Sequence, residues 1–222
     1  ALIRRVLRAL LPALVLVLAV LGSILAGVAT PTESAAVGAV GAMALAAGRG
    51  TLSRDMLAGV AQTTAKLSSM AFMLLFGASV FILVFRGLGG DVLVEGMLKS
   101  LPGGLHAALA VVMAVVFVLG FFLDPFEILF IIVPIACPAL IIMGADPLWL
   151  GVLIALNLQT SFLTPPFGFS LFYLRSVAPP EVTTGHIYRG IVPFVVIQLL
   201  AIAAVWTMPT LATGLPRRFL GY

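Results

Sequence analysis

Charged residues are scarce in this sequence: they make up 9% of its 222 residues, whereas 62% are hydrophobic. Soluble domains carry about a quarter charged residues, because a folded sphere has to present polar atoms to water. With a mean hydropathy of +1.25, this chain has to contact lipid over most of its surface. The composition therefore excludes an ordinary soluble domain and a water-exposed enzyme.

Cysteine is almost absent, since Cys137 alone can form neither an internal disulfide nor a cysteine-based metal site. The sequence also lacks H-E-x-x-H, G-x-S-x-G and Walker-type motifs, which carry metalloprotease, hydrolase and ATPase chemistry. We therefore predict no enzymatic activity, no cofactor and no transition-metal site. The net charge of +4 comes from basic residues at segment ends rather than from a stripe, which disfavours nucleic-acid binding.

Several apolar runs approach or exceed the roughly 20 residues that a helix needs to cross a bilayer. Weak period-two alternation argues against a membrane β-barrel, so the sequence predicts an all-α integral membrane protein, a polytopic helical bundle. The chain opens at Ala1 with a basic turn and continues into membrane sequence without a good cleavage site, so we expect a piece of a longer protein. The expected spans or arms are 7–29, 68–85, 107–144, 147–163 and 191–208, with a short piece at 34–47 and an amphipathic segment at 52–67.

Four segments pair a residue that can cap a helix with a following proline. The cap oxygen accepts an orphan backbone N–H, and proline loses nothing at the first helical position. We therefore expect four helix starts, at Thr30-Pro31, Asp124-Pro125, Asp146-Pro147 and Thr164-Pro165. The first two also carry a glutamate at the third position, Glu33 and Glu127, which can reach back to the cap N–H.

Asp124 and Glu127 lie midway along an apolar stretch that is too long for one span. This stretch fits two helical arms that turn back on each other at Leu123-Asp124-Pro125. Carboxylates at membrane depth are costly and usually mark an ion or substrate path. The turn is therefore a candidate functional site, with a plain capped turn as the alternative.

A second candidate is the polar face before the break at Thr164-Pro165-Pro166. Asn157, Thr160, Ser161 and Thr164 fall three or four residues apart and share a helical face, whereas Gln159 points elsewhere. The two prolines remove N–H donors and free carbonyls upstream. Together with amide and hydroxyl oxygens, such carbonyls suit a hard cation, as in the discontinuous helices of secondary transporters. Helix–helix cohesion is the alternative use of such a face.

The order of these motifs resembles a known family. It begins with Gly-x-x-Thr-Pro-Thr-Glu-Ser-Ala-Ala-Val at 27–37 and continues with the Leu-Asp turn and an arm that contains Pro134 and Pro138. Gly144-Ala145-Asp146-Pro147, Asn157-Leu158 and the Thr-Pro-Pro-Phe-Gly string at 164–168 complete it. The pattern resembles the C-terminal half of the large membrane subunit of tripartite ATP-independent periplasmic (TRAP) transporters.

The resemblance implies one half of an inverted-repeat, elevator-type secondary transporter of the bacterial inner membrane. The region 107–178 would be transport-type, with a re-entrant helical hairpin at 107–144 and a broken helix at 147–177. Residues 1–106 would form scaffold-type spans and an amphipathic connector, and 179–222 a terminal span and tail. The resemblance also implies three partners besides the bilayer: the N-terminal half of the permease, a small membrane subunit and a periplasmic solute-binding protein.

The family's sodium sites lie where hairpin tips meet the unwound helix, which implies sodium as the coupling ion and an organic acid as the substrate. The residues that would bind sodium are Asp124, Asn157, Thr164, Pro165 and Gly168. The residues that would bind substrate or gate its access are Glu127, Thr160, Ser161 and Pro166. The sequence departs from the family where Pro125, Phe126 and Glu127 replace the commoner small or hydroxyl residues after the aspartate.

Two alternatives stay open. A proton-coupled transporter or antiporter of similar architecture would use Asp124 or Glu127 as the titrating group. A membrane scaffold without a transport role would pack the polar face of 157–164 against a neighbouring helix.

Overall fold

The computed structural model describes residues 2–165, 169–179 and 181–220, and these residues form helices and no strands. The chain divides into two compact units, Ala1–Ser68 and Ser69–Tyr222. Among the described helices, three are long and apolar enough to cross a membrane: Arg54–Gly87, Pro125–Ile142 and Thr184–Thr207. The all-α membrane fold that the composition predicts is therefore confirmed.

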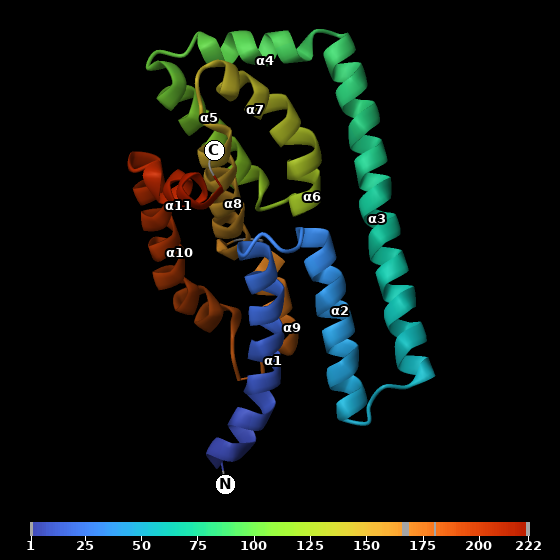
Figure 1. Cartoon of the computed structure of the whole chain (residues 1–222). Coiled ribbons are helices and arrows are strands. Elements are labelled where there is room, and N and C mark those ends of the chain that lie inside the picture. Colours follow the sequence, from blue (N-terminus) through green and yellow to red (C-terminus); the bar gives the residue numbers. More distant parts are fainter. Residues whose placement is uncertain (1, 166–168, 180, 221–222) are drawn as a thin grey trace. The chain divides into compact units, whose positions relative to one another are not determined.

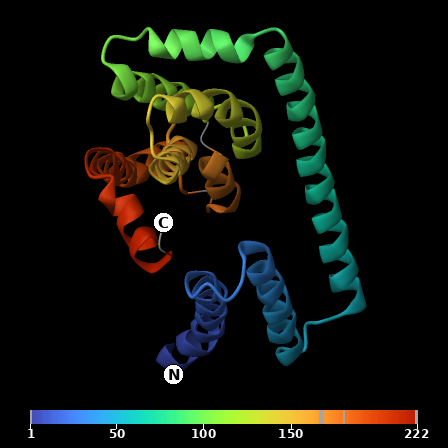
Figure 2. The same ribbon diagram turned by 45° about the horizontal axis from the view of Figure 1, so that its top comes forward.

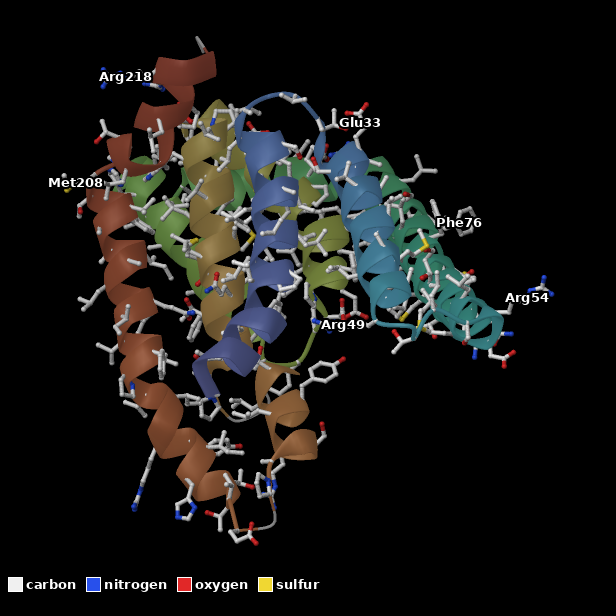
Figure 3. The ribbon with its side chains drawn as sticks, turned by 60° about the horizontal axis from the view of Figure 1, so that its bottom comes forward. Glu33, Arg49, Arg54, Phe76, Met208 and Arg218 are labelled. Carbon is white, nitrogen blue, oxygen red and sulfur yellow. The ribbon has the colours of Figure 1, made fainter. Side chains whose placement is uncertain are left out.

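The first unit contains α1 (Leu2–Leu25), α2 (Pro31–Gly48) and the start of α3 (Arg54–Gly87). α1 and α2 lie side by side (Figure 1), and a 2.8 Å hydrogen bond joins the hydroxyls of Ser23 and the fully buried Ser34. Thr30 caps α2 as predicted. The Glu33 carboxylate accepts the Thr30 N–H at 2.8 Å, and Figure 3 shows Glu33 and Arg49 at opposite ends of α2.

α3 corrects one prediction, because the expected amphipathic segment and the span after it are one helix of 34 residues. Neither proline nor a turn motif separates them, so nothing ends the helix at Ser68. Large apolar side chains stand exposed along it, such as Phe76 with 67% of its surface accessible (Figure 3). Lipid is the environment that makes such exposure favourable.

The second unit contains the end of α3 and all later helices. They are α4 (Gly90–Lys99), α5 (Gly104–Leu119), α6 (Pro125–Glu127), the π-turn η1 (Ile128–Ile132), α7 (Val133–Ile142), α8 (Pro147–Leu163), α9 (Phe169–Val177), α10 (Thr184–Thr207) and α11 (Thr210–Leu220). α4 runs from the end of α3 to α5 (Figure 2). The chain turns sharply there, because Gly89 has a φ of +78° and Gly90 lies against the Phe85 ring.

The core of the second unit forms where α5, α7 and α8 meet. It is built from Leu109 and Val116 of α5, Leu140 of α7, and Leu150 and Leu153 of α8, each with at most 2% of its surface exposed. α5 and the segment α6–η1–α7 are the two predicted arms, and the chain turns at Leu123-Asp124-Pro125 as expected. α8 packs against both α5 and α10.

Two helix ends differ from the predictions. α10 begins at Thr184, seven residues before the expected start at Ile191, because Thr183 and His186 form a capping box. Thr164 does not start a helix: it is the C-cap of α8, and the next described helix begins at Phe169. Its extended backbone (ψ 132°) is what the following proline imposes.

Candidate functional site: the polar face of α8 and the hairpin turn

The predicted polar face of α8 exists and is buried. Asn157 has 4% of its surface exposed, and Thr160 and Ser161 have none. Gln159 is exposed on a different side of the helix, as predicted, and lines an apolar cavity of about 530 Å³ between α8 and the second hairpin arm. The polar face and this cavity therefore lie on different sides of α8.

Asn157 joins α8 to the first hairpin arm. Its Nδ2 donates a 2.8 Å hydrogen bond to the backbone carbonyl of Met113 in α5. This bond fixes the orientation of the amide group and uses its NH₂ group as the donor. The Oδ1 atom is the acceptor side of the same group. The contact also provides helix–helix cohesion.

The three hydroxyls of this face donate to backbone carbonyls of their own helix. Thr160 donates to Leu156 at 2.7 Å and Ser161 to Leu158 at 2.8 Å. Thr164 donates to Thr160 at 2.7 Å. A hydroxyl that gives its proton to a carbonyl still has lone pairs on its oxygen. The face therefore presents oxygen acceptors, which is the ligand type that a hard cation prefers.

The carbonyls at the end of α8 are less free than the sequence predicted. Pro165 has no N–H to donate to the Ser161 carbonyl. The Thr164 N–H donates to this carbonyl instead, at 3.1 Å, in a bond that spans three residues and tightens the end of the helix. Pro165 itself is half-buried, directly after the C-cap. Pro166 and Gly168, which the resemblance placed in the site, lie outside the described residues.

Asp124 caps the second hairpin arm, because its Oδ1 accepts the Phe126 N–H at 2.9 Å. Glu127 occupies the third helical position, but no capping box forms here, unlike at Thr30. Both carboxyl residues are half-buried. Within the described part of the chain, no hydrogen bond or ion pair joins either carboxylate to α8.

The hairpin and α8 nevertheless come together at Gly120, the residue that ends α5. A Cβ atom at Gly120 would lie only 2.8 Å from the Cβ of Ser161. The end of the first arm therefore lies against α8 one helical turn before Thr164. This contact was not anticipated, because a single glycine among apolar residues gives no sequence signal of what it packs against.

Two prolines shape the second arm. The π-turn at Ile128–Ile132, in which the Val133 N–H bonds the Ile128 carbonyl, ends two residues before Pro134. Pro138 has no N–H for the Pro134 carbonyl. The Arg86 guanidinium at the end of α3 bonds that carbonyl at 3.2 Å instead, so α3 is joined to this arm.

The start of α8 is fixed by a second set of contacts. Asp146 Oδ1 accepts the N–H groups of Trp149 at 3.0 Å and Leu148 at 2.9 Å, and Oδ2 pairs with Arg217 of α11 at 2.7 Å. The Trp149 N–H, then the Leu148 N–H and Arg217, hold the pKa of this carboxyl below its ordinary value of 3.8. Trp149 Nε1 also donates to the Val205 carbonyl of α10 at 2.7 Å, so α8 is anchored at the end opposite to its polar face.

No cluster of three or more His, Cys, Asp or Glu side chains that could hold a metal ion occurs within the described ranges. The chemistry that the polar face supports is coordination of a hard cation by neutral oxygens. Three described helices that are long and apolar enough to cross a membrane define a polytopic α-helical membrane protein.

Comparison with known proteins identifies the family. Residues 1–211 match the family "Tripartite ATP-independent periplasmic transporter, DctM component". The chain is 30% identical to the C4-dicarboxylate TRAP transporter large permease protein DctM of Pseudomonas aeruginosa, over 91% of this chain and 47% of the relative. It is 29% identical to the sialic acid TRAP transporter large permease protein SiaM of Vibrio cholerae serotype O1 over the same shares, 91% and 47%.

The ectoine TRAP transporter large permease protein TeaC of Halomonas elongata is 28% identical over 87% of this chain and 45% of its own length. The chain belongs to the DctM family of TRAP transporter large permeases and is a multi-pass protein of the bacterial inner membrane. It spans about half the length of the curated relatives that it matches.

Proposed function

We propose that this chain is the second repeat of a TRAP large permease that imports an organic acid by sodium-coupled secondary transport, and that it acts as a permease and not as an enzyme. Family membership supports the transport class. Relatives of the chain are named as transporters of sialic acid and of C4-dicarboxylates, which are organic acids. The observation that carries the sodium site is the buried oxygen face of α8, where Asn157 is oriented by its bond to Met113.

The proposed mechanism assigns sodium to the space between the hairpin turn and the end of α8. Asn157 and Thr164 offer side-chain oxygens, Pro165 offers its carbonyl, and Asp124 lies on the hairpin turn. Sodium orders the turn, and the anionic substrate then binds at nearby half-helix N-termini, whose dipoles favour negative charge. Thr160, Ser161 and Glu127 would bind this substrate or gate its access. As the resemblance implies, Gly168 would also bind sodium, and Pro166 would bind substrate or gate its access.

The hairpin and the broken helix would move together against a scaffold of outer spans. The contacts of α5 with α8, through Asn157 and through Gly120, support a common movement of the two. Sodium and substrate would drive this movement by binding one facing state better than the other. The proposed partners are the N-terminal half, the small membrane subunit and the periplasmic binding protein that delivers the substrate.

Uptake by proteoliposomes tests the proposal. They would hold the full-length permease, its small subunit and the cognate binding protein, with and without an inward sodium gradient. We expect uptake that requires both the sodium gradient and the binding protein. Uptake that ignores sodium and follows a proton gradient would contradict sodium coupling and point to Asp124 or Glu127 as proton carriers.

A further inference from the structure

The contact between Gly120 and Ser161 leaves no room for a side chain at position 120. A Cβ there would meet Ser161 Cβ at 2.8 Å and Ser161 Oγ at a still shorter distance. Real Cβ atoms essentially never approach other atoms within 3.0 Å. Gly120 has a right-handed backbone (φ −64°, ψ −8°), which any residue adopts. The position therefore requires glycine for space and not for backbone freedom.

Ser161 cannot move aside easily. Its side chain is fully buried, and its hydroxyl is held by the 2.8 Å bond to the Leu158 carbonyl. Its backbone belongs to a helix that Asp146, Trp149 and Asn157 fix to neighbouring elements. Extra volume at position 120 would therefore displace the end of α5 rather than Ser161, because well-packed interiors do not absorb added atoms without backbone shifts.

The two residues stand beside the two halves of the proposed cation site. The turn after Gly120 is tied back to α5 by bonds from the Phe122 and Leu123 N–H groups to the Leu119 carbonyl, at 2.9 and 2.8 Å. A displacement of the chain at Gly120 would therefore also move Asp124, the residue that follows Leu123. On the other side, Ser161 lies three residues before Thr164.

We propose that Gly120 is a positioning residue for the coupling cation: its contact with Ser161 sets how closely the hairpin turn approaches the end of α8. This inference rests on the proposed sodium site. Ligand groups have to lie within about half an ångström of their productive positions. A side chain at position 120 therefore weakens sodium binding without touching the ion.

The test is a double-variant cycle in the full-length permease, reconstituted with its small subunit and binding protein. The readout is the sodium concentration that gives half-maximal uptake. We expect Gly120→Ala to raise this concentration about tenfold, since it displaces the turn from its ligand geometry. In the Ser161→Gly background the same substitution should change it little, because the atoms that it meets are gone.

Two comparisons make the steric cause specific. Ser161→Ala should not relieve the effect of Gly120→Ala, because alanine keeps the Cβ atom that lies 2.8 Å away. Gly151→Ala is the matched control, since a Cβ at this α8 glycine meets nothing within 4 Å. We expect it to leave the sodium dependence unchanged.

The outcomes separate this inference from the function on which it rests. If the unsubstituted permease shows sodium-dependent uptake and Gly120→Ala leaves the half-maximal concentration unchanged, the inference is overturned and sodium coupling stands. An equal effect of Gly120→Ala in the Ser161 and Ser161→Gly backgrounds would also overturn it. Uptake by the unsubstituted permease that is indifferent to sodium would overturn both.

Discussion

Asn157 uses the two ends of one amide group differently. Its nitrogen donates to the Met113 carbonyl in α5, and its oxygen is the proposed ligand of the ion. Replacing Asn157 by Ala removes both, and loss of the hydrogen bond alone costs about 1 kcal/mol of stability. We expect Asn157→Ala, and likewise Thr164→Ala, to raise the sodium concentration for half-maximal uptake about tenfold, which corresponds to ~1.4 kcal/mol of binding free energy.

Gln159→Ala is the control for this prediction. Gln159 is also an amide residue of α8, but it is exposed and lines the apolar cavity on another side of the helix. Its removal should leave the sodium dependence unchanged. If Asn157→Ala and Gln159→Ala shift the sodium dependence equally, the assignment of the ion to the polar face is wrong.

Asp146 allows its capping role and its ion pair to be measured separately. Asp146→Asn keeps a residue that caps helices but loses the charge opposite Arg217, whereas Asp146→Ala loses both. Because the Arg217 and Asp146 side chains are 57% and 34% exposed, the ion pair contributes roughly 0–1 kcal/mol. Loss of the cap costs about 1 kcal/mol more. In thermal unfolding at neutral pH, Asp146→Asn should therefore be slightly less stable than the unsubstituted protein, and Asp146→Ala less stable than Asp146→Asn.

The pH dependence of the same variants has a defined sign. The Asp146 pKa is lower in the folded protein than its ordinary value of 3.8. The ionised carboxylate therefore stabilises the fold above the unfolded pKa, and this contribution is lost as the pH falls through the lowered folded value. The stability difference between the unsubstituted protein and Asp146→Asn should shrink in that acidic window. A difference that grows on acidification would contradict this account.

At the scale of the helices, the second hairpin arm depends on Arg86 because of its prolines. Arg86→Gln should lower the free energy of unfolding by about 1 kcal/mol, since the Pro134 carbonyl loses its 3.2 Å partner. In a Pro138→Ala background the new N–H at position 138 can bond that carbonyl, and the effect of Arg86→Gln should become smaller. Denaturation of the four proteins in this cycle measures the coupling. Independent, additive effects would show that the contact does not compensate for Pro138.

The sequence predicted those elements whose signals are local. Proline after a capping residue located the starts of α2, α6 and α8, and the carboxylates in an apolar stretch located the hairpin turn. The C-capping role of Thr164 and the start of α10 were not predicted, because their sequence signals are ambiguous or weak. Thr164 combines a capping residue with proline but ends α8, because the following proline favours its extended backbone. Its hydroxyl and N–H bond the Thr160 and Ser161 carbonyls. A cap built with His186 has no strong sequence signal.

The buried site was only partly predictable, because its spacing along α8 is local but its contacts with α5 join residues distant in sequence. The spacing of Asn157, Thr160, Ser161 and Thr164 correctly indicated one helical face. That the Asn157 amide would bond the Met113 carbonyl, 44 residues away, is a property of the packed fold. The same holds for Gly120, whose role appears only when Ser161 is seen beside it.

For the whole molecule, the chain spans about half of its relatives' length. In the proposed inverted-repeat arrangement, substrate and ion sites form between two repeats. We therefore expect liposomes that hold only these 222 residues to show no uptake above protein-free liposomes. Uptake by such liposomes would show that one repeat forms a complete site.

Ion-dependent thermal unfolding of the full-length permease would measure whether the polar face of α8 binds the coupling sodium. A ligand that binds only the folded state stabilises it by RT ln(1 + [L]/Kd), about 2.7 kcal/mol at a hundredfold excess over Kd. If sodium binds this face, replacing choline by sodium at constant ionic strength should raise the unfolding midpoint of the unsubstituted permease and of Gln159→Ala. It should raise that of Asn157→Ala much less. A sodium-specific rise that is just as large in Asn157→Ala would contradict sodium binding at this face, as would no sodium-specific rise in any of the three.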